Sequence, residues 1–191
     1  PPPPPPPNFQ AEDGIRDQGD GLVGSEMCIR DSVYGDDIDT DRIIAGKYTK
    51  TLNLQDLADH VLEDLDIDFR SKLVKGDVLV AGTNFGCGSS REQAPLALKV
   101  AGVSAVVAKY FARIFFRNAI NIGLPVLEVP DLEADSGDEL EIDLKAGVVR
   151  NLTKGTDHKA SAMPQVMIDI LDQGGLVAYL KKNGTYDASA L

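Results

Sequence analysis

The chain has 191 residues, of which 43% are hydrophobic and 26% are charged, and its formal net charge is -11. This composition is typical of one globular domain that buries its core without disulfides or a structural metal. The acidic balance, with no basic run, argues against nucleic acid as a partner, because a phosphate-binding surface needs an excess of Lys and Arg.

The sequence also indicates in which cellular compartment the protein is expected. The two cysteines, Cys28 and Cys87, form no CxxC or Cys/His pattern that predicts a disulfide framework or a metal site. The sequence contains no run of roughly 18 apolar residues and no signal-peptide pattern. We therefore expect a soluble, cytoplasmic protein with no membrane partner.

Residues 1–32 differ from the rest of the chain. Seven prolines open the segment, and polyproline forms an extended helix without internal hydrogen bonds, which cannot join a core. Residues 11–32 lack apolar periodicity and resemble translated sequencing-adapter sequence. We predict that residues 1–32 are a non-native or disordered segment without chemistry, and that one domain spans residues 33–191. A genuine disordered tail is the alternative.

From Val33 onward, helical and strand patterns alternate along the chain. In chain order, we predict an acidic turn at residues 36–44, a helix at 54–62, a strand at 77–81, a helix at 92–100, a strand at 105–108, a helix at 111–122, a strand at 125–129, a hairpin at 140–149 and a closing helix at 164–182. The alternating strands and helices predict parallel pairing with right-handed crossovers. With the hairpin added, the prediction is an α/β fold with a mixed, largely parallel sheet and flanking helices.

A glycine-rich turn at residues 82–92 lies between a predicted strand and a predicted helix. Ser89 or Ser90 stands where a helix cap is expected, and the amides of a helix start, together with Arg91, suit a carboxylate or phosphate. Neither the nucleotide P-loop nor the dinucleotide fingerprint is matched, because the Lys and the third Gly are missing. The alternative is a purely structural turn, in which the serines cap the helix and Arg91 pairs with an acidic neighbour.

Residues 84–95 read NFGCGSSREQAP, which resembles the signature of the aconitase-superfamily swivel domain, most closely that of the isopropylmalate dehydratase small-subunit family. Supporting stretches at 35–41, 110–125 and 174–176 occur in family order. The resemblance implies a swivelling β/β/α domain. It also implies the small subunit of a heteromeric hydro-lyase of leucine biosynthesis, which isomerises 2-isopropylmalate to 3-isopropylmalate by dehydration and rehydration.

The same resemblance implies a partner and a cofactor. The partner is a large subunit that carries a [4Fe–4S] cluster, and the substrate is a small dicarboxylic or tricarboxylic acid. We expect no cofactor or metal on this chain, because one cysteine, Cys87, cannot hold a cluster that needs three or four thiolates.

The family's base is the first serine of the Ser-Ser-Arg turn, which is Ser89 here. A serine hydroxyl is a weak base, so an alkoxide would need the helix-start amides, Arg91 and a dry, closed site to lower its pKa. Ser90 and Arg91 are then predicted to bind a substrate carboxylate.

Further residues are assigned from the resemblance as hydrogen-bonding support of the site. They are Asp41, Thr40, Asn84 and Arg113, of which Thr40 and Asp41 are expected to line its entrance. His60 and His158 are expected to be solvated and receive no role.

The resemblance places substrate selection in residues 47–51, where Tyr48, Lys50 and Thr51 are predicted substrate contacts. Isopropylmalate enzymes tend to have apolar or neutral residues there, whereas relatives that take homoaconitate tend to have an arginine. Lys50 supplies a cation without the bidentate fork of Arg, and Thr49 replaces the usual leucine. The substrate therefore stays open between isopropylmalate, homoaconitate and a methylmalate-type acid.

Two functions of other classes compete with the hydro-lyase. A non-catalytic anion- or nucleotide-binding module could use the same turn, although the missing Lys and third Gly disfavour it. An RNA-binding regulator is disfavoured by the net charge of -11 and by the lack of interleaved aromatic and basic residues.

Overall fold

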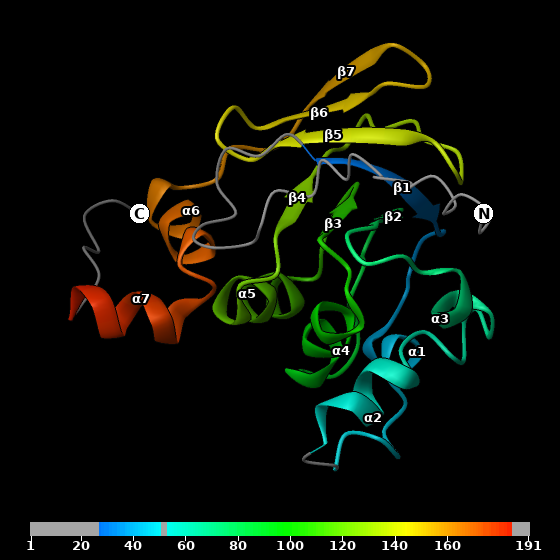
Figure 1. Ribbon diagram of the computed structural model, residues 1–191, viewed down its shortest axis with the longest axis vertical. Helices are drawn as coiled ribbons and strands as arrows, with labels where there is room; N and C mark the ends of the chain where they lie inside the picture. The colour runs from blue at the N-terminus through cyan, green and yellow to red at the C-terminus, as the bar shows by residue number, and fades with distance from the viewer. Residues whose placement is uncertain (1–26, 51–52, 185–191) are drawn as a thin grey trace, which may run out of the picture.

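Figure 1 shows the computed structural model of the protein, in which residues 27–50 and 53–184 are described. The elements in chain order are β1 (Met27–Val33), α1 (Thr40–Ile43), α2 (Leu54–Asp59), α3 (Phe69–Lys72), β2 (Val78–Ala81), α4 (Gln93–Ala101), β3 (Ala105–Ala108), α5 (Arg113–Ile122), β4 (Val126–Glu128), β5 (Glu139–Asp143), β6 (Val148–Asn151), β7 (Thr156–Lys159), α6 (Gln165–Asp172) and α7 (Leu176–Asn183). The strand order is β4-β3-β2-β1-β5-β6-β7. Strands β1 to β4 pair in parallel and β5 to β7 are antiparallel, so the predicted mixed sheet is confirmed.

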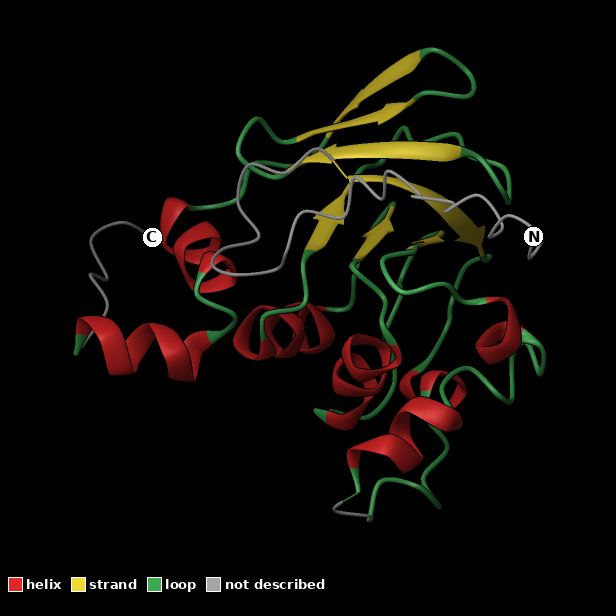
Figure 2. Ribbon diagram, in the orientation of Figure 1, coloured by secondary structure: helices red, strands yellow, loops and turns green. Residues whose placement is uncertain are grey.

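Strand β2 shows why the buried strands read as continuous apolar runs. Leu79 and Ala81 belong to the core shared with the helices, whereas Val78 and Val80 belong to a second core shared with the antiparallel strands. Both faces of the parallel strands are therefore covered, as is usual for parallel sheets. Figure 2 shows the helices gathered on one side of the strands. The layers are antiparallel strands, parallel strands and helices, which confirms the expected β/β/α arrangement.

Strand β1 joins the two halves of the sheet. It pairs in parallel with β2 and antiparallel with β5, and it begins at Met27. The segment that the sequence analysis set apart, residues 1–32, therefore ends inside a strand of the sheet. Residues 1–26 lie outside the described residues, and the non-native or disordered character of the segment stays a prediction.

The predicted closing helix and the last strand, β7, compare differently with the structure. The closing helix is divided at Gly174–Gly175 into α6 and α7, as its glycines indicated; a Cβ on Gly175 would stand 2.7 Å from the Asn121 carbonyl oxygen. Strand β7 was not predicted. It is a largely exposed run of Thr, Asp, His and Lys without apolar alternation, so it carries no strand signal. In the described ranges, no helix is both long and apolar enough to cross a membrane.

Asp138, which precedes β5, is a buried carboxylate with a full set of donors. Its side chain accepts hydrogen bonds from the Asp135 amide at 2.9 Å and from Asn151 Nδ2 at 2.7 Å, and Lys154 Nζ lies 3.5 Å away. The Asp135 amide above all, together with Asn151 and Lys154, lowers the pKa of Asp138. A carboxylate that is favoured in this way stabilises the folded state in its ionised form.

The lowered pKa of Asp138 predicts an acid-sensitive stability. Its contribution is complete above the unfolded pKa of about 3.9 and is lost as the pH falls through the lower folded value. We expect the thermal midpoint of Asp138→Asn to lie below that of the unsubstituted chain at pH 7, and the two midpoints to converge toward pH 3. Calorimetry across this range is the measurement, with exposed Asp131→Asn as the control. A constant gap between the two curves would contradict the prediction.

Candidate functional site

The glycine-rich turn runs from the end of β2 to the start of α4. Gly86 and Gly88 have φ angles of 77° and 88°, and Asn84 also has a positive φ, of 64°. A Cβ on Gly86 would overlap the ring of Phe115, so this position requires glycine for both its space and its backbone angle. The turn is therefore wound tightly over helix α5.

The predicted helix cap is wrong. Helix α4 begins at Gln93 and its N-cap is Glu92, which has a helical backbone and makes no side-chain capping bond. Ser89 and Ser90 precede this start and are exposed. The capping prediction failed because the chain makes a separate turn, in which the Arg91 amide donates to the Ser89 carbonyl at 2.9 Å, before the helix begins. The serines are thus not used as caps and stand at the surface.

The acidic segment, residues 36–41, runs alongside the turn and is hydrogen-bonded to it. Asp36 Oδ1 accepts from the Thr83 amide at 2.6 Å, and Asn84 Nδ2 donates to Asp37 Oδ1 at 2.8 Å. The backbones continue the pairing, because the Gly86 amide donates to the Ile38 carbonyl at 2.7 Å. Several carboxylates on a short segment thus act as acceptors for a backbone that cannot form regular structure.

Thr40 connects this segment to Ser89. Its side chain is buried, and its amide donates to the Cys87 carbonyl at 2.9 Å. Its hydroxyl donates to the Ser89 carbonyl at 2.9 Å and lies 3.4 Å from Ser89 Oγ. Because a hydroxyl has one proton, the Thr40 oxygen is the acceptor in the longer contact and Ser89 is the donor. The structure thus brings the Thr40 hydroxyl to both the carbonyl and the side chain of Ser89.

Arg91 is held against the acidic segment. One guanidinium nitrogen, Nη1, forms an ion pair with Asp41 and donates to the Ile44 carbonyl at 3.3 Å. A Cβ on Gly46 would stand 3.5 Å from both terminal nitrogens of Arg91. The pairing with an acidic neighbour, expected for a purely structural turn, is therefore present. It engages Nη1, and Arg91 Nε and Nη2 have no acceptor among the described residues.

Cys87 has the properties of a packed thiol. Burial, followed by the charges of Asp39 and Asp37, raises its pKa, which opposes the thiolate that a metal requires. The described residues contain no group of three or more His, Cys, Asp or Glu side chains that could hold a metal ion. These residues do not fit an iron–sulfur cluster.

The predicted selection residues are placed unevenly. Tyr48 is partly buried, and its hydroxyl donates to the Glu63 carboxylate at 3.2 and 3.3 Å. Lys50 is exposed and forms no ion pair with a described residue. Thr51 lies outside the described residues. The structure therefore gives Tyr48 a protein partner and leaves the Lys50 cation open to solvent.

Two further predicted residues differ in their relation to the turn. Asn84 is part of it, through the bond to Asp37. Arg113 begins α5 and is exposed, with no ion pair in the described part of the chain. The contacts of Asp36 and Asp37 with the turn were not predicted from the sequence. The close spacing of aspartates in this segment could have indicated them, because such aspartates commonly accept hydrogen bonds from turn amides.

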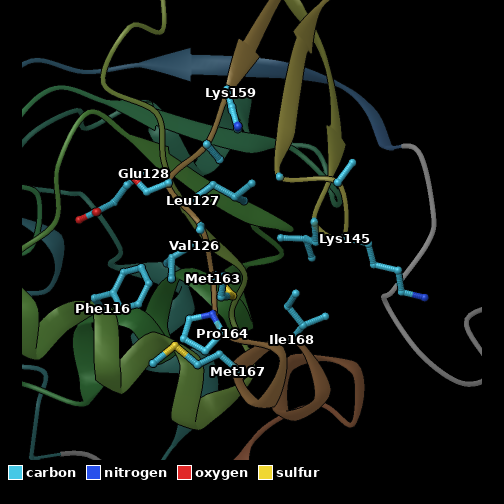
Figure 3. A pocket seen from close by; sticks show the side chains of 16 residues that line it. Phe116, Val126, Leu127, Glu128, Lys145, Lys159, Met163, Pro164, Met167 and Ile168 are labelled. Carbon is cyan, nitrogen blue, oxygen red and sulfur yellow. The ribbon is translucent and has the colours of Figure 1, made fainter. Parts of the chain in front are cut away.

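Cavities elsewhere in the molecule do not include the exposed serines. One of about 390 Å³ lies between β4, the 144–147 turn and α6, and apolar side chains such as Phe116, Met163 and Ile168 surround it (Figure 3). A second, of about 450 Å³, lies at the base of the turn beside Gly82, and a third, of about 180 Å³, lies between α5, α6 and α7. None of these three, all lined by described residues, contains Ser89, Ser90 or Arg91.

Comparison with known proteins places these features in a family. Residues 38–132 match the Aconitase C-terminal domain. The chain is 59% identical over 152 residues to 3-isopropylmalate dehydratase small subunit 2 of Archaeoglobus fulgidus, covering 79% of this chain and 92% of the relative. It is 54% identical over 149 residues to the methanogen homoaconitase small subunit of Methanothermobacter thermautotrophicus, covering 78% and 87%.

A solved structure is also similar. The crystal structure of 3-isopropylmalate dehydratase from Methanocaldococcus jannaschii superposes with a TM-score of 0.80 and 46% identity, over 84% of this chain and 96% of the other.

Proposed function

The chain belongs to the family of 3-isopropylmalate dehydratase small subunits, hydro-lyase components built on the aconitase C-terminal domain, and we propose that it contributes Ser89 and Arg91 to the dehydration of 2-isopropylmalate in leucine biosynthesis. The designation of its relatives as small subunits implies a large-subunit partner. We propose that this partner carries the [4Fe–4S] cluster and completes the site, because the described residues here do not fit a cluster.

The observation that carries this proposal is the exposed Ser89 on a turn whose backbone is hydrogen-bonded to the acidic segment. The turn is bonded along its length to the acidic segment, yet Ser89 remains exposed and lies in none of the three cavities. A rigid turn with an exposed hydroxyl is suited to a site that a second protein closes. Closure would exclude water and strengthen the electrostatic effect of Arg91 on the serine.

In the proposed reaction, an alkoxide at Ser89 accepts a proton from the methylene carbon of 2-isopropylmalate and becomes a hydroxyl. The hydroxyl group of the neighbouring carbon takes up a proton from an acid on the large subunit and departs as water, which gives an unsaturated diacid. In the second half-reaction, water adds its hydroxyl group to the former methylene carbon and returns one proton to that acid, while Ser89 gives its proton to the carbon that bears the isopropyl group. The proton taken up in the first half-reaction is thus released in the second, and the product is 3-isopropylmalate.

Arg91 and the backbone supply the binding groups. The free edge of Arg91, Nε and Nη2, matches the two oxygens of a carboxylate. The amides of Ser90 and Glu92 have no acceptor among the described residues and are further donors for an anion. We therefore propose that Ser90 and Arg91 bind one substrate carboxylate while Ser89 reaches the adjacent carbon.

A homoaconitase small subunit is the second candidate. The exposed Lys50 cation suits an additional carboxylate on the substrate, and the homoaconitase relative is 54% identical to the chain. Both candidates use the same turn and the same type of reaction. The two candidates differ only in the substrate side group that residues 47–51 would bind.

Reconstitution with a large subunit tests the proposal. We expect the isolated chain to be inactive and the complex to form the unsaturated diacid from 2-isopropylmalate, measured by its ultraviolet absorbance. The ratio of kcat/KM for isopropylmalate to kcat/KM for homoaconitate distinguishes the two candidates. Turnover by the chain alone, or a purified complex inactive on both acids, would contradict the proposed function.

A further inference from the structure

A cluster of four side chains holds the chain segment that follows the acidic segment. The Tyr48 and His60 rings are stacked, with centroids 3.8 Å apart and planes inclined by 5°. Glu63 accepts from the Tyr48 hydroxyl and contacts His60 Nδ1 through the same oxygen, Oε2. Lys47 Nζ lies 4.6 Å from the centre of the Tyr48 ring and 3.5 Å from Glu63 Oε1. We call Lys47, Tyr48, His60 and Glu63 the tyrosine clamp.

The clamp holds a turn that contacts the guanidinium of Arg91. Within this turn, the Tyr48 amide donates to the Ala45 carbonyl at 2.9 Å, and the Thr49 hydroxyl donates to the Gly46 carbonyl at 2.9 Å. Gly46, inside the same turn, borders Arg91 so closely that an added Cβ would be in van der Waals contact with both terminal nitrogens. A shift of the turn would therefore change the space around Arg91 and the direction in which Lys50 leaves the turn.

Glu63, the acceptor of the clamp, follows a residue that is hydrogen-bonded to the segment bordering Arg91. The Leu62 amide donates to the Ile43 carbonyl at 2.8 Å, and Leu62 is buried with a φ of 58°. Ile43 precedes Ile44, the carbonyl of which accepts from Arg91 Nη1. Glu63 is thus carried on a strained and buried backbone that is tied to the segment bordering Arg91. Strained residues of this kind persist where their surroundings hold them in place.

From these contacts we propose that His60 and Glu63 are positioning residues, which act through Tyr48 to set the turn that borders Arg91 and carries Lys50. This inference rests on the proposed function, since it assigns the role of Tyr48 in the same site. Tyr48 anchors the turn through its hydroxyl and ring, and the substrate meets the turn at Lys50 and Arg91. His60, which the sequence analysis treated as a solvated side chain, forms one face of the anchor.

The charges of the clamp agree with this geometry. The hydrogen bond from His60, followed by the Lys47 charge and the Tyr48 hydroxyl, lowers the pKa of Glu63. The Glu63 carboxylate therefore stays ionised near neutral pH and accepts from both ring partners. Because 27% of its side chain is exposed, solvent weakens these attractions. The clamp is therefore expected to affect position more than global stability.

Three conservative variants test the clamp in the reconstituted complex. Tyr48→Phe keeps the ring and removes the hydroxyl, His60→Phe keeps the stack and removes the contact with Glu63, and Glu63→Gln keeps the shape and removes the charge. For each variant we expect KM to rise about tenfold while kcat changes by less than about threefold, since a displaced turn weakens ground-state binding. Tyr179→Phe and Glu133→Gln are matched controls on α7 and in the loop before β5.

A second readout is independent of turnover. Amide hydrogen exchange of residues 45–49 in the isolated chain is expected to speed up in Tyr48→Phe and Glu63→Gln, with thermal midpoints near that of the unsubstituted chain. Faster exchange together with a complex that has no hydro-lyase activity would retain the clamp and reject the proposed function. Unchanged exchange and unchanged KM would overturn the clamp. A KM effect with unchanged exchange would also overturn it, because Tyr48 would then contact the substrate directly.

Discussion

Alanine in place of Ser89 is expected to lower kcat of the reconstituted complex by about 10²- to 10⁴-fold, the range usual for loss of a positioned general base. KM is expected to stay within about threefold, because Arg91 and the turn amides remain to bind the substrate carboxylate. The Ser89 side chain is exposed, and its contact within the described part of the chain is the one with the Thr40 hydroxyl. The variant should therefore fold and assemble normally, which size-exclusion chromatography with the large subunit would check.

The size of this effect follows from what surrounds the hydroxyl. In the free chain, Ser89 donates toward Thr40, whose own proton is given to the Ser89 carbonyl. Among the described residues, the contact given for the Ser89 hydroxyl is with Thr40, which is not a base, so the proposed alkoxide would depend on Arg91, the turn amides and closure by the partner. Without the oxygen, those groups have no base to stabilise.

Steady-state rates of proton exchange into the substrate would localise the loss. If Ser89 is the base, Ser89→Ala loses exchange of the methylene proton along with turnover, whereas exposed Ser161→Ala leaves both unchanged. Turnover at the unsubstituted rate in Ser89→Ala would remove Ser89 from the mechanism. The hydrogen bonds that hold the turn against the acidic segment do not depend on this outcome.

The fold could be predicted from the sequence wherever burial leaves a periodic signal. Strands β2 and β3 are short apolar runs because both of their faces are covered, and Gly102 and Gly123 end α4 and α5 in left-handed conformations, within one residue of the predicted helix ends at 100 and 122. Strand β7 gave no signal because its side chains face solvent. Strand β1 was missed for another reason, since residues 27–32 were set aside for their lack of apolar periodicity and their resemblance to translated adapter sequence.

The glycine-rich turn was predictable in its location and less so in its construction. Glycine spacing identified the turn at 82–92, but the cap prediction assumed that α4 starts where the glycines end. The contacts that fix the turn come from residues about 47 positions away, as between Asp36 and Thr83. Such pairings depend on the placement of β1 beside β2. Local patterns in the sequence cannot show these pairings. They also did not show the tyrosine clamp, in which Tyr48 contacts residues of a later segment.

The second large effect is expected at Gly86, where alanine should lower the free energy of unfolding by about 2–5 kcal/mol. A left-handed backbone costs a non-glycine residue about 1–2 kcal/mol, and overpacking against a buried ring adds about 1–3 kcal/mol. Gly86 has a φ of 77°, and its missing Cβ would overlap Phe115, which is 1% exposed. Denaturant unfolding of the isolated chain is the measurement.

Gly155→Ala separates the two causes. Gly155 has a φ of 68°, close to that of Gly86, but nothing lies within 4 Å of its added Cβ. It should therefore show only the backbone cost of about 1–2 kcal/mol. The double variant Gly86→Ala with Phe115→Leu should lose less stability than the sum of its single variants, because the smaller side chain makes room for the methyl group. Additive losses, or equal losses at Gly86 and Gly155, would show that the turn does not rest on the Phe115 ring. Since Ser89 is three residues beyond Gly86, contact of the turn with the Phe115 ring would help to hold the proposed base in position.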